Sequence, residues 1–335
     1  MSNSELLTTE LYPLQFEPIL RRLIWGDRRL GTVLNKPLGD ANDYAESWEI
    51  SDYREQVSIV RCGALAGVSL RELLRARPRE LFGSALGARD QFPLLVKFID
   101  AQEVLSVQVH PDDERAARLA GDSGKTEAWV VVAAEPGSRI YAGLASGVTP
   151  ESLREAIARG AVEPLLHRFE PRPGDCILIE AGTVHAIGAG VLLTEIQQMS
   201  DATFRIDDWN RVGPDGKPRP LHIEEALESI DFARGPVNPL VPESAVTAAG
   251  NVRERLARSR YFEIDRYQLE RPEAIGEADR FTIILCLGGS AAVDCRAGSY
   301  PLRFGETMLL PAVLGTCTIR PEGRATILRC VVPTP

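Results

Sequence analysis

The feature that most constrains the fold is a two-faced segment, Val104-Leu-Ser-Val-Gln-Val-His110. In a β-strand, successive side chains point to opposite faces of the sheet. If the segment is a strand, one face carries only apolar side chains, those of Leu105, Val107 and Val109. The opposite face carries the polar side chains of Ser106, Gln108 and His110. Such a strand is suited to the wall of a cavity, with polar groups facing inward and aliphatic groups packed behind them.

Composition limits the class of protein. The chain has 335 residues, of which 44% are hydrophobic and 25% charged, as in one large or two ordinary globular domains. Its net charge of −9 argues against nucleic acid and anionic membranes as partners. An anionic small molecule remains open, because a local basic pocket can override the overall sign.

The termini and cysteines indicate a location. Residues 1–10 lack a basic start and an apolar run, so we expect no signal peptide. No segment approaches the roughly 18 apolar residues of a membrane helix. The six cysteines are scattered without a Cys-x-x-Cys pair, which favours reduced thiols over disulfides. We therefore expect a cytoplasmic protein.

Most of the chain is predicted to be β-structure with a few peripheral helices. Capping residues predict helices from Ser69 to Gly83, with an interruption at Pro78, and from Thr149 to Gly160. Shorter helices are expected at 114–120, 163–169 and 223–230. Residues 126–134 and 191–198 are predicted strands, and almost everything from residue 261 to residue 332 is predicted to be strands and glycine turns.

An internal repeat indicates two related units. The segment from Gly174 to His185 aligns without a gap on the segment from Gly305 to Thr316, each with a Gly-acid turn before an apolar strand. The pattern resembles the second signature of cupin barrels. Thr316 stands where the first copy has His185, so only the first unit has a histidine there. We expect a mainly β fold of two cupin-like (jelly-roll) barrel units: a catalytic domain at 1–235, a linker at 236–250 and a domain without a metal site at 251–335.

The histidines suggest a metal centre. Of the four, His110 and His185 occupy strand-and-turn positions in the first unit, with Gln108 and Glu127 on predicted strands nearby. Nitrogen and oxygen donors without thiolate suit zinc, manganese or iron in a site open to substrate. The alternative is that both histidines are ordinary hydrogen-bonded polar residues. His167 and His222 are assigned to helices and given no role in the site.

Charged residues within apolar strands are further candidates. Lys97 lies between Val96 and Phe98, where burial is costly unless its ammonium group reaches an anion or an open cavity. Glu195 lies in the apolar run 191–198 and suits either a general base or a structural ion pair. Arg205 alternates with Asp201 and Thr203.

Six motifs together carry a family resemblance. They are Trp25-Gly26, Glu46-Ser-Trp-Glu-Ile-Ser51, Leu105-Ser-Val-Gln-Val-His-Pro-Asp112, Gly124-Lys-Thr-Glu-Ala-Trp129, Gly182-Thr-Val-His-Ala-Ile-Gly188 and Gln198-Met-Ser-Asp-Ala-Thr-Phe-Arg205. In this order, over essentially the whole chain, they resemble type I phosphomannose isomerases of the short bacterial form. Asp27 and Ala45 stand where the family usually has glycine, which affects loop detail only.

The resemblance implies roles for individual residues. It implies one Zn²⁺ per chain, held by Gln108, His110, Glu127 and His185. It implies that Arg205 is catalytic, that Lys97 and Ser106 contact the phosphate, and that Lys125, Glu195 and Asp201 lie around the sugar.

The implied reaction interconverts mannose 6-phosphate and fructose 6-phosphate through an enediol. Glu195 is the leading base and Lys125 a further acid, and a hydride shift is the alternative path. Competing hypotheses are a non-catalytic sugar-phosphate-binding cupin, and a cupin oxygenase or epimerase. No nucleic acid or membrane partner is expected, and the oligomeric state stays open, with a monomer as the simplest arrangement.

Overall fold

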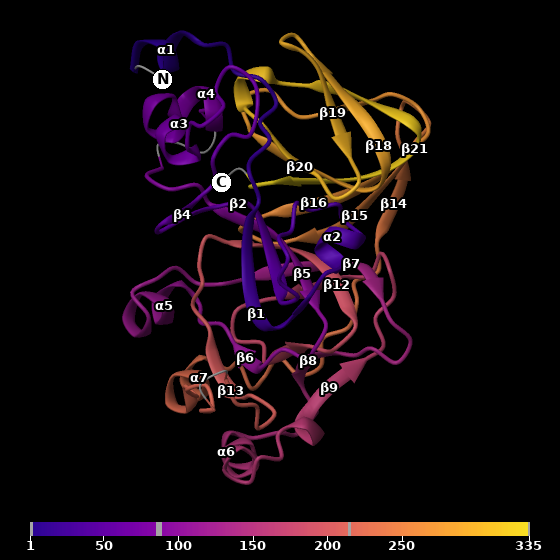
Figure 1. Cartoon of the computed structure of the whole chain (residues 1–335). Coiled ribbons are helices and arrows are strands. Elements are labelled where there is room, and N and C mark those ends of the chain that lie inside the picture. The colour runs from indigo at the N-terminus through magenta and orange to yellow at the C-terminus, as the bar shows by residue number, and fades with distance from the viewer. Residues whose placement is uncertain (1–2, 85–88, 214–215, 334–335) are drawn as a thin grey trace.

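The chain folds into two β units, one above the other in Figure 1. The computed structural model describes residues 3–84, 89–213 and 216–333. The first unit has two large sheets and a two-stranded sheet of β3 (Asp52–Tyr53) and β4 (Gln56–Val57), and the second unit is built on a single eight-stranded sheet. The mainly β, cupin-type fold with peripheral helices is therefore confirmed.

The first sheet of the first unit has six antiparallel strands in the order β1-β2-β5-β12-β7-β10. Their bounds are Ile19–Asp27, Tyr44–Ile50, Leu94–Ala101, Val191–Gln198, Glu127–Ala134 and Cys176–Ile179. Every residue of β5 and β12 is buried, because both faces of the sheet are covered. One face meets the second sheet and the other meets the C-terminal unit.

The second sheet of this unit has five strands in the order β13-β6-β11-β8-β9. Their bounds are Phe204–Asp207, Val107–Val109, His185–Ile187, Ile140–Leu144 and Leu166–Phe169. The central strands are short, so side chains near their ends lie at the rim of the sheet.

The C-terminal unit is built on an eight-stranded sheet. Its main path runs β14 (Glu243–Val246), β15 (Val252–Arg258), β16 (Glu263–Leu269), β21 (Cys317–Val331), β18 (Thr282–Cys295) and β19 (Gly298–Arg303). β17 (Glu273–Ile275) and β20 (Thr307–Leu310) pair at its side. β14 lies within the segment expected to be a linker and pairs with β15.

The repeat seen in the sequence has a structural counterpart. Gly174 and Gly305 have φ angles of 91° and 80°, and a strand begins two residues after each, β10 and β20 respectively. A positive φ of this size favours glycine. Beyond β20 the chain enters a short 3₁₀ turn, η2 (Ala312–Leu314), and there is no histidine to match His185.

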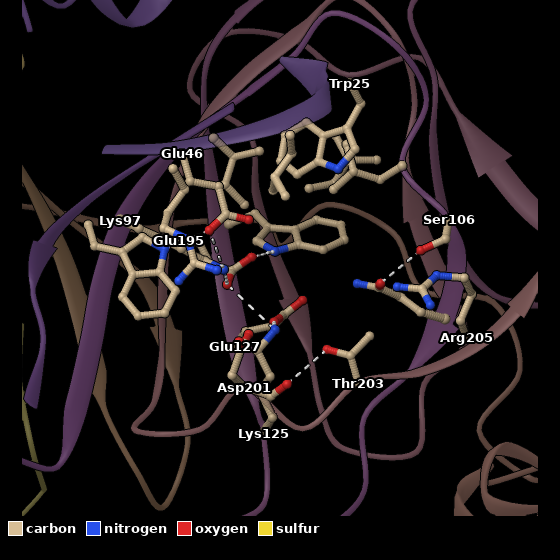
Figure 2. Close-up of a pocket in the computed structure, with 18 of the residues that line it drawn as sticks. Trp25, Glu46, Lys97, Ser106, Lys125, Glu127, Glu195, Asp201, Thr203 and Arg205 are labelled. Atoms are coloured by element: carbon tan, nitrogen blue, oxygen red, sulfur yellow. Dashed lines mark hydrogen bonds and ion pairs between the residues drawn. The ribbon is translucent and has the colours of Figure 1, made fainter. Parts of the chain in front are cut away.

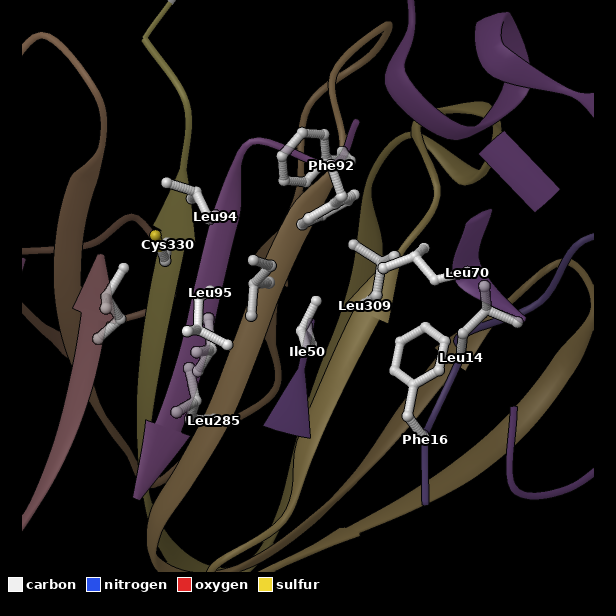
Figure 3. Packing of buried hydrophobic residues seen from close by; sticks show 14 of the residues in the cluster. Leu14, Phe16, Ile50, Leu70, Phe92, Leu94, Leu95, Leu285, Leu309 and Cys330 are labelled. Atoms are coloured by element: carbon white, nitrogen blue, oxygen red, sulfur yellow. The ribbon is translucent and has the colours of Figure 1, made fainter. Parts of the chain in front are cut away.

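One apolar cluster joins the two units. It includes Leu94 and Leu95 of β5, Leu285 of β18 and Leu328 and Cys330 of β21, and Figure 3 shows these strands packed face to face. The N-terminal segment contributes Leu14, whose backbone pairs with Leu309 of β20. The six-stranded sheet is therefore held from behind by the C-terminal unit.

The helices lie at the periphery. They are α1 (Asn3–Thr8), α2 (Arg29–Thr32), α3 (Leu70–Ala76), α4 (Pro78–Phe82), α5 (Asp113–Leu119), α6 (Pro150–Ala158) and α7 (Ile223–Ser229). Ser69 and Glu72 form the predicted capping box. The helix is interrupted before Pro78 as expected, so that α3 and α4 are separate.

The helix predicted at 163–169 is wrong. A 3₁₀ turn, η1 (Glu163–Leu165), leads directly into strand β9. Phe169 pairs with Ile140 of β8, so this segment forms the edge of the five-stranded sheet. Pairing with a neighbouring strand outweighed the local helical pattern.

The strand expected at 104–110 is shorter than predicted. The assigned strand covers only β6. Before it, the Leu105 N–H donates to the carbonyl of Ile187 at 2.8 Å, and the Leu105 carbonyl accepts from the indole Nε1 of Trp209 at 2.7 Å. Val107 and Val109 pack behind the sheet as expected. Leu105 instead joins the cluster that contains Trp25 and Trp129, so the apolar face is not continuous.

Two further expectations concern location. In the described ranges, no helix is both long and apolar enough to cross a membrane. All six cysteines are free; Cys176, Cys286, Cys317 and Cys330 are buried, Cys295 is half-buried and Cys62 is exposed.

Truncating the shared cluster should destabilise both units together. Leu328 is fully buried, so Leu328→Ala should lower the free energy of unfolding by about 2–5 kcal/mol. Urea unfolding followed by circular dichroism and by tryptophan fluorescence should shift by the same amount. All four tryptophans lie in the first unit.

The control is Val246→Ala, because Val246 is 75% exposed and its truncation should change the free energy by less than about 0.5 kcal/mol. The shared cluster would be contradicted if tryptophan fluorescence gave Leu328→Ala the same urea midpoint of unfolding as the unmodified protein.

Candidate active site and metal centre

A cavity of about 330 Å³ lies between the two sheets of the first unit. Side chains from β1, β2, β5, β7 and β12 line one side, and side chains from β6 and β13 line the other. Figure 2 shows these groups converging on one open space. The described lining includes five cationic side chains (Arg21, Lys97, Lys125, Arg205 and Arg219) and four carboxylates (Glu46, Glu127, Glu195 and Asp201).

Two cross-strand rows place the polar groups. Residues directly opposite each other in an antiparallel pair point to the same face. In the five-stranded sheet, Gln108 is opposite both His185 and Arg205. In the six-stranded sheet, Lys97 is opposite Trp48 and Glu195, and Glu195 is opposite Trp129. Strand register thus brings together residues far apart in the sequence, such as Trp48 and Glu195.

His110, Glu127 and His185 form a buried cluster beside the cavity. One ligand atom from each lies within 4.8 Å of the other two. Glu127 Oε2 is 3.4 Å from His110 Nε2, and Glu127 Oε1 is 3.5 Å from His185 Nε2. His185 is delivered by a turn at Gly182, whose φ of 88° favours glycine. The predicted ligands therefore converge.

The tautomers of both histidines follow from their contacts. His110 Nδ1 lies 2.8 Å from the carbonyl of Ala202, and His185 Nδ1 lies 2.9 Å from that of Thr183. A carbonyl only accepts, so each Nδ1–H donates and the lone pair of each ring is on its Nε2. Burial, followed by Lys125, lowers the pKa of His110 to about 4, and burial also lowers the pKa of His185. Both rings are neutral near pH 7.

This arrangement fits a cation. Two imidazole lone pairs face a carboxylate, and Glu127 Oε1 is buried with no hydrogen-bond donor among the described residues. Burial raises the pKa of Glu127, but Lys125 and His110 outweigh it, so the net pKa lies well below the ordinary value. A divalent ion would satisfy all three acceptors.

Two neighbours complete this cluster. The Gln108 amide nitrogen lies 3.3 Å from His185 Nε2, and a 180° amide flip would present its oxygen there instead. Lys125 Nζ donates to Glu127 Oε2 at 2.6 Å and lies 2.9 Å from His110 Nε2. Lys125 is thus the positive charge that balances Glu127 in this structure.

A second buried cluster surrounds Glu195. Its Oε1 lies 3.0 Å from Lys97 Nζ and 3.7 Å from Lys125 Nζ, and its Oε2 accepts from Trp129 Nε1 at 2.9 Å. Lys97 Nζ also lies 3.8 Å from Glu46. Burial lowers the pKa of Lys97, but Glu195 and Glu46 outweigh it and the net pKa is raised. Lys97 therefore stays charged and already faces two carboxylates.

Arg205 lies on another side of the cavity. Its Nη1 donates to the carbonyl of Pro220 at 2.9 Å, while its Nε is buried without an acceptor in the described part of the chain. Burial and nearby Arg219 lower the pKa of Arg205. Figure 2 shows Ser106 on the same side as Arg205, away from Lys97.

The structure thus assembles the predicted set. Lys97, Ser106, Gln108, Lys125, Glu127, Glu195, Asp201 and Arg205 all line the cavity. His110 and His185 lie directly behind Glu127 and Gln108. Asp201 is exposed at the rim.

Several cavity residues were missed. Glu46 and Trp48 alternate along β2 and could have been inferred from the strand pattern. Arg21, whose guanidinium lies 5.0 Å from the Trp48 ring, and Arg219, held by Asp208 at 2.7 Å, carried no local signal.

The other two histidines are not among the residues that line the cavity. His222 precedes α7 as expected, and its Nδ1 also accepts the backbone N–H of Arg205 at 3.2 Å. His167 was expected on a helix but lies on β9.

Comparison with known proteins gives consistent matches. Residues 14–129 match the family model for the phosphomannose isomerase type I catalytic domain, and residues 253–331 match the mannose-6-phosphate isomerase cupin domain. The chain is 34% identical to the mannose-6-phosphate isomerase ManA of Bacillus subtilis, over 97% of this chain and 99% of that protein. It is 33% identical to the mannose-6-phosphate isomerase of Streptococcus mutans, over 89% and 92% of the two chains.

Solved structures agree. The crystal structure of the Bacillus subtilis mannose 6-phosphate isomerase superposes with a TM-score of 0.87 at 28% identity, covering 96% of this chain and 99% of that one. The apo form of the Salmonella typhimurium enzyme, at 17% identity and a TM-score of 0.73, shares the fold over 96% of this chain and 100% of that one. The chain belongs to the type I phosphomannose isomerase family.

Proposed function

We propose that this protein is a zinc-dependent mannose-6-phosphate isomerase that interconverts mannose 6-phosphate and fructose 6-phosphate through an enediol. The observation that supports it best is the meeting of a His-Glu-His cluster, a buried carboxylate between two lysines and an arginine with a free buried donor in one cavity. The names of the full-length relatives support the substrate.

The metal would be held by His110, Glu127, His185 and the amide oxygen of Gln108, one ion per chain. When bound there, zinc would supply Lewis-acid polarisation of the substrate's carbonyl. The donor set also suits manganese or iron. The choice of zinc comes from the family resemblance.

Glu195 is proposed as the base. The reaction removes the proton from C2 of the open-chain aldose and returns a proton to C1, while a second proton moves between the two oxygens. Lys97 and Lys125 hold Glu195 as a carboxylate, and the Trp129 indole fixes its orientation. Lys125 is the proposed acid for the oxygen-to-oxygen transfer, since its ammonium group lies between Glu195 and Glu127.

Arg205 is proposed to stabilise the negative charge of the enediolate. Guanidinium stays protonated and can donate parallel hydrogen bonds. Its buried Nε, which lacks an acceptor among the residues described, would gain one only when a negatively charged oxygen is opposite it. Such a contact favours the transition state over the bound sugar.

The phosphate is proposed to bind at the Ser106 side of the cavity. Arg205 and Arg219 also line the cavity, and their charges interact. The predicted phosphate contact of Lys97 stays a prediction, because Glu195 and Glu46 already share its charge. We assign Lys97 mainly to holding Glu195. Asp201 would contact sugar hydroxyls at the rim.

The alternatives make different demands. A non-catalytic sugar-phosphate-binding protein needs no Glu195–Lys125 pair beside the metal ligands, and an oxygenase would use an iron-type His/His/carboxylate set without phosphate-binding cations. A coupled assay from mannose 6-phosphate to fructose 6-phosphate separates all three.

Metal removal should abolish isomerisation. After dialysis against a chelator the coupled assay should show less than about 1% of the starting rate, because carbonyl polarisation is worth several kcal/mol. One equivalent of Zn²⁺ should restore the rate. Full activity in protein shown to be metal-free by elemental analysis would rule out the proposed metal role.

Substitutions of Arg205 and Glu195 should lower the turnover number more than they weaken substrate binding. Arg205→Ala should lower kcat about 10²–10³-fold, and Glu195→Gln about 10²–10⁴-fold, with KM changed less than about threefold. Arg154→Ala is the matched control, since this arginine forms only an exposed pair with Glu224.

Solvent deuterium incorporation distinguishes the enediol path from a hydride shift. In D₂O, deuterium should appear at C1 of fructose 6-phosphate, because the enediol exchanges its proton with solvent. Complete retention of the substrate's own hydrogen would contradict the enediol and favour a hydride shift.

Substitutions of Ser106 and Lys97 should change different kinetic parameters, KM for the first and kcat for the second. Ser106→Ala should raise KM for mannose 6-phosphate about fivefold with kcat nearly unchanged, since it removes one hydrogen bond to the phosphate. Lys97→Met should mainly lower kcat, because Glu195 loses its nearest cation. The reverse pattern, with KM raised only by Lys97→Met, would place the phosphate at Lys97.

A further inference from the structure

A single carboxylate, that of Asp113, connects the C-terminal unit to the loop before the metal centre. Asp113 is the first residue of α5 and lies three positions after His110. Its two oxygens have different partners. Oδ1 accepts from the backbone N–H of Gly124 at 3.0 Å and from Gln198 Nε2 at 2.9 Å. Both donors belong to the first unit.

The other oxygen faces the C-terminal unit. Oδ2 accepts from the Tyr261 hydroxyl at 2.7 Å and from Arg260 Nη2 at 2.6 Å. Arg260 and Tyr261 lie in the turn between β15 and β16. The carboxylate is therefore held from both units, one oxygen for each.

The loop that Asp113 contacts presents the catalytic side chains. Gln198, oriented by Asp113, accepts the backbone N–H of Thr126 through its Oε1 at 2.9 Å. The backbone N–H of Lys125, between them, donates to the carbonyl of Pro111 at 3.1 Å. Three successive amides, at 124, 125 and 126, are thus fixed immediately before Glu127.

Close packing makes this loop sensitive to Asp113. A Cβ on Gly124 would lie 2.5 Å from the backbone nitrogen of Asp113, so the chain passes α5 with no room for a side chain. Lys125 Nζ then reaches Glu127 Oε2 and His110 Nε2. A shift of the loop would move the ammonium group relative to both.

We propose that Asp113 is a positioning residue for catalysis. The C-terminal unit acts on the active site because Tyr261 and Arg260 fix the carboxylate of Asp113. The catalytic part rests on the proposed isomerase function. This gives the C-terminal unit a role beyond covering the back of the six-stranded sheet. None of the three side chains lines the catalytic cavity.

The test compares two variants in one turn. The double variant Arg260→Ala/Tyr261→Phe removes both donors to Oδ2. The matched control is Arg258→Ala, since Arg258 is exposed and its ion-pair partner in the described part of the chain is Glu263, opposite it across β15 and β16, at 2.9 Å. Both changes lie on the C-terminal unit, away from the catalytic side chains.

The first measurement is amide hydrogen exchange at Gly124 and Thr126, on protein without added metal or sugar. In the double variant these two amides should exchange about tenfold faster, because a hydrogen bond to a charged group is lost on one side of the carboxylate. Amides of β16 should exchange as before. In the control every amide should match the unmodified protein.

The second measurement is steady-state kinetics with zinc added. In the double variant kcat should fall about five- to twentyfold with KM changed less than twofold, since Lys125 and Glu127 are displaced from the reacting atoms. Asp113→Asn, which keeps the shape but weakens the acceptor, should have the same direction of effect. Thermal unfolding midpoints show whether any loss reflects unfolding instead.

The outcomes separate the hypotheses. Exchange at Gly124 and Thr126 equal to that of the control, or faster exchange with unchanged kcat, would overturn the inference. If the unmodified protein fails to isomerise mannose 6-phosphate, the proposed function is lost, while amide exchange still shows whether Asp113 holds the loop.

Discussion

The charge balance around Glu127 is the interaction on which the site depends. Two neutral imidazoles direct their lone pairs at this buried carboxylate, because backbone carbonyls take the proton on the other ring nitrogen of each. An uncompensated buried carboxylate would cost several kcal/mol. Lys125 supplies one positive charge, and a divalent ion would supply more.

Strand register holds the groups of the site in place. The row Arg205–Gln108–His185 crosses the five-stranded sheet, and the row Trp48–Lys97–Glu195–Trp129 crosses the six-stranded sheet. Side chains on strands are held more rigidly than side chains on loops, because the ladder hydrogen bonds fix their backbone. The two sheets therefore present the His110–Glu127–His185 cluster and the Glu195 cluster to one space.

The local charge of the cavity differs from that of the chain. The chain carries a net charge of −9, yet five cations and four carboxylates are among the groups around the cavity. A bound divalent ion would add to this excess. An anionic sugar phosphate is thus attracted locally, although the overall charge repels large polyanions.

The C-terminal unit shares the glycine turn and strand of the repeat with the first unit but differs from it in chemistry. The repeat places β20 where the first unit has β10, but Thr316 replaces the histidine and the interior is filled by an apolar cluster that includes Ile284, Met308 and Ile327. Its contribution is to support the six-stranded sheet through the shared cluster and, by the inference above, to hold Asp113.

The sequence by itself determined the mainly β class, the repeat, the capped helices and the set of proposed site residues, because alternation, capping boxes and glycine turns are local and the six motifs are specific in combination. It mispredicted residues 163–169, since the strand formed there depends on pairing with β8, a partner distant in the chain. It had no means to find Arg21, Arg219 or the Asp113 bridge. Those contacts exist only because sheet pairing and the packing of the two units bring separate segments within hydrogen-bonding distance, and that was decided by the tertiary structure.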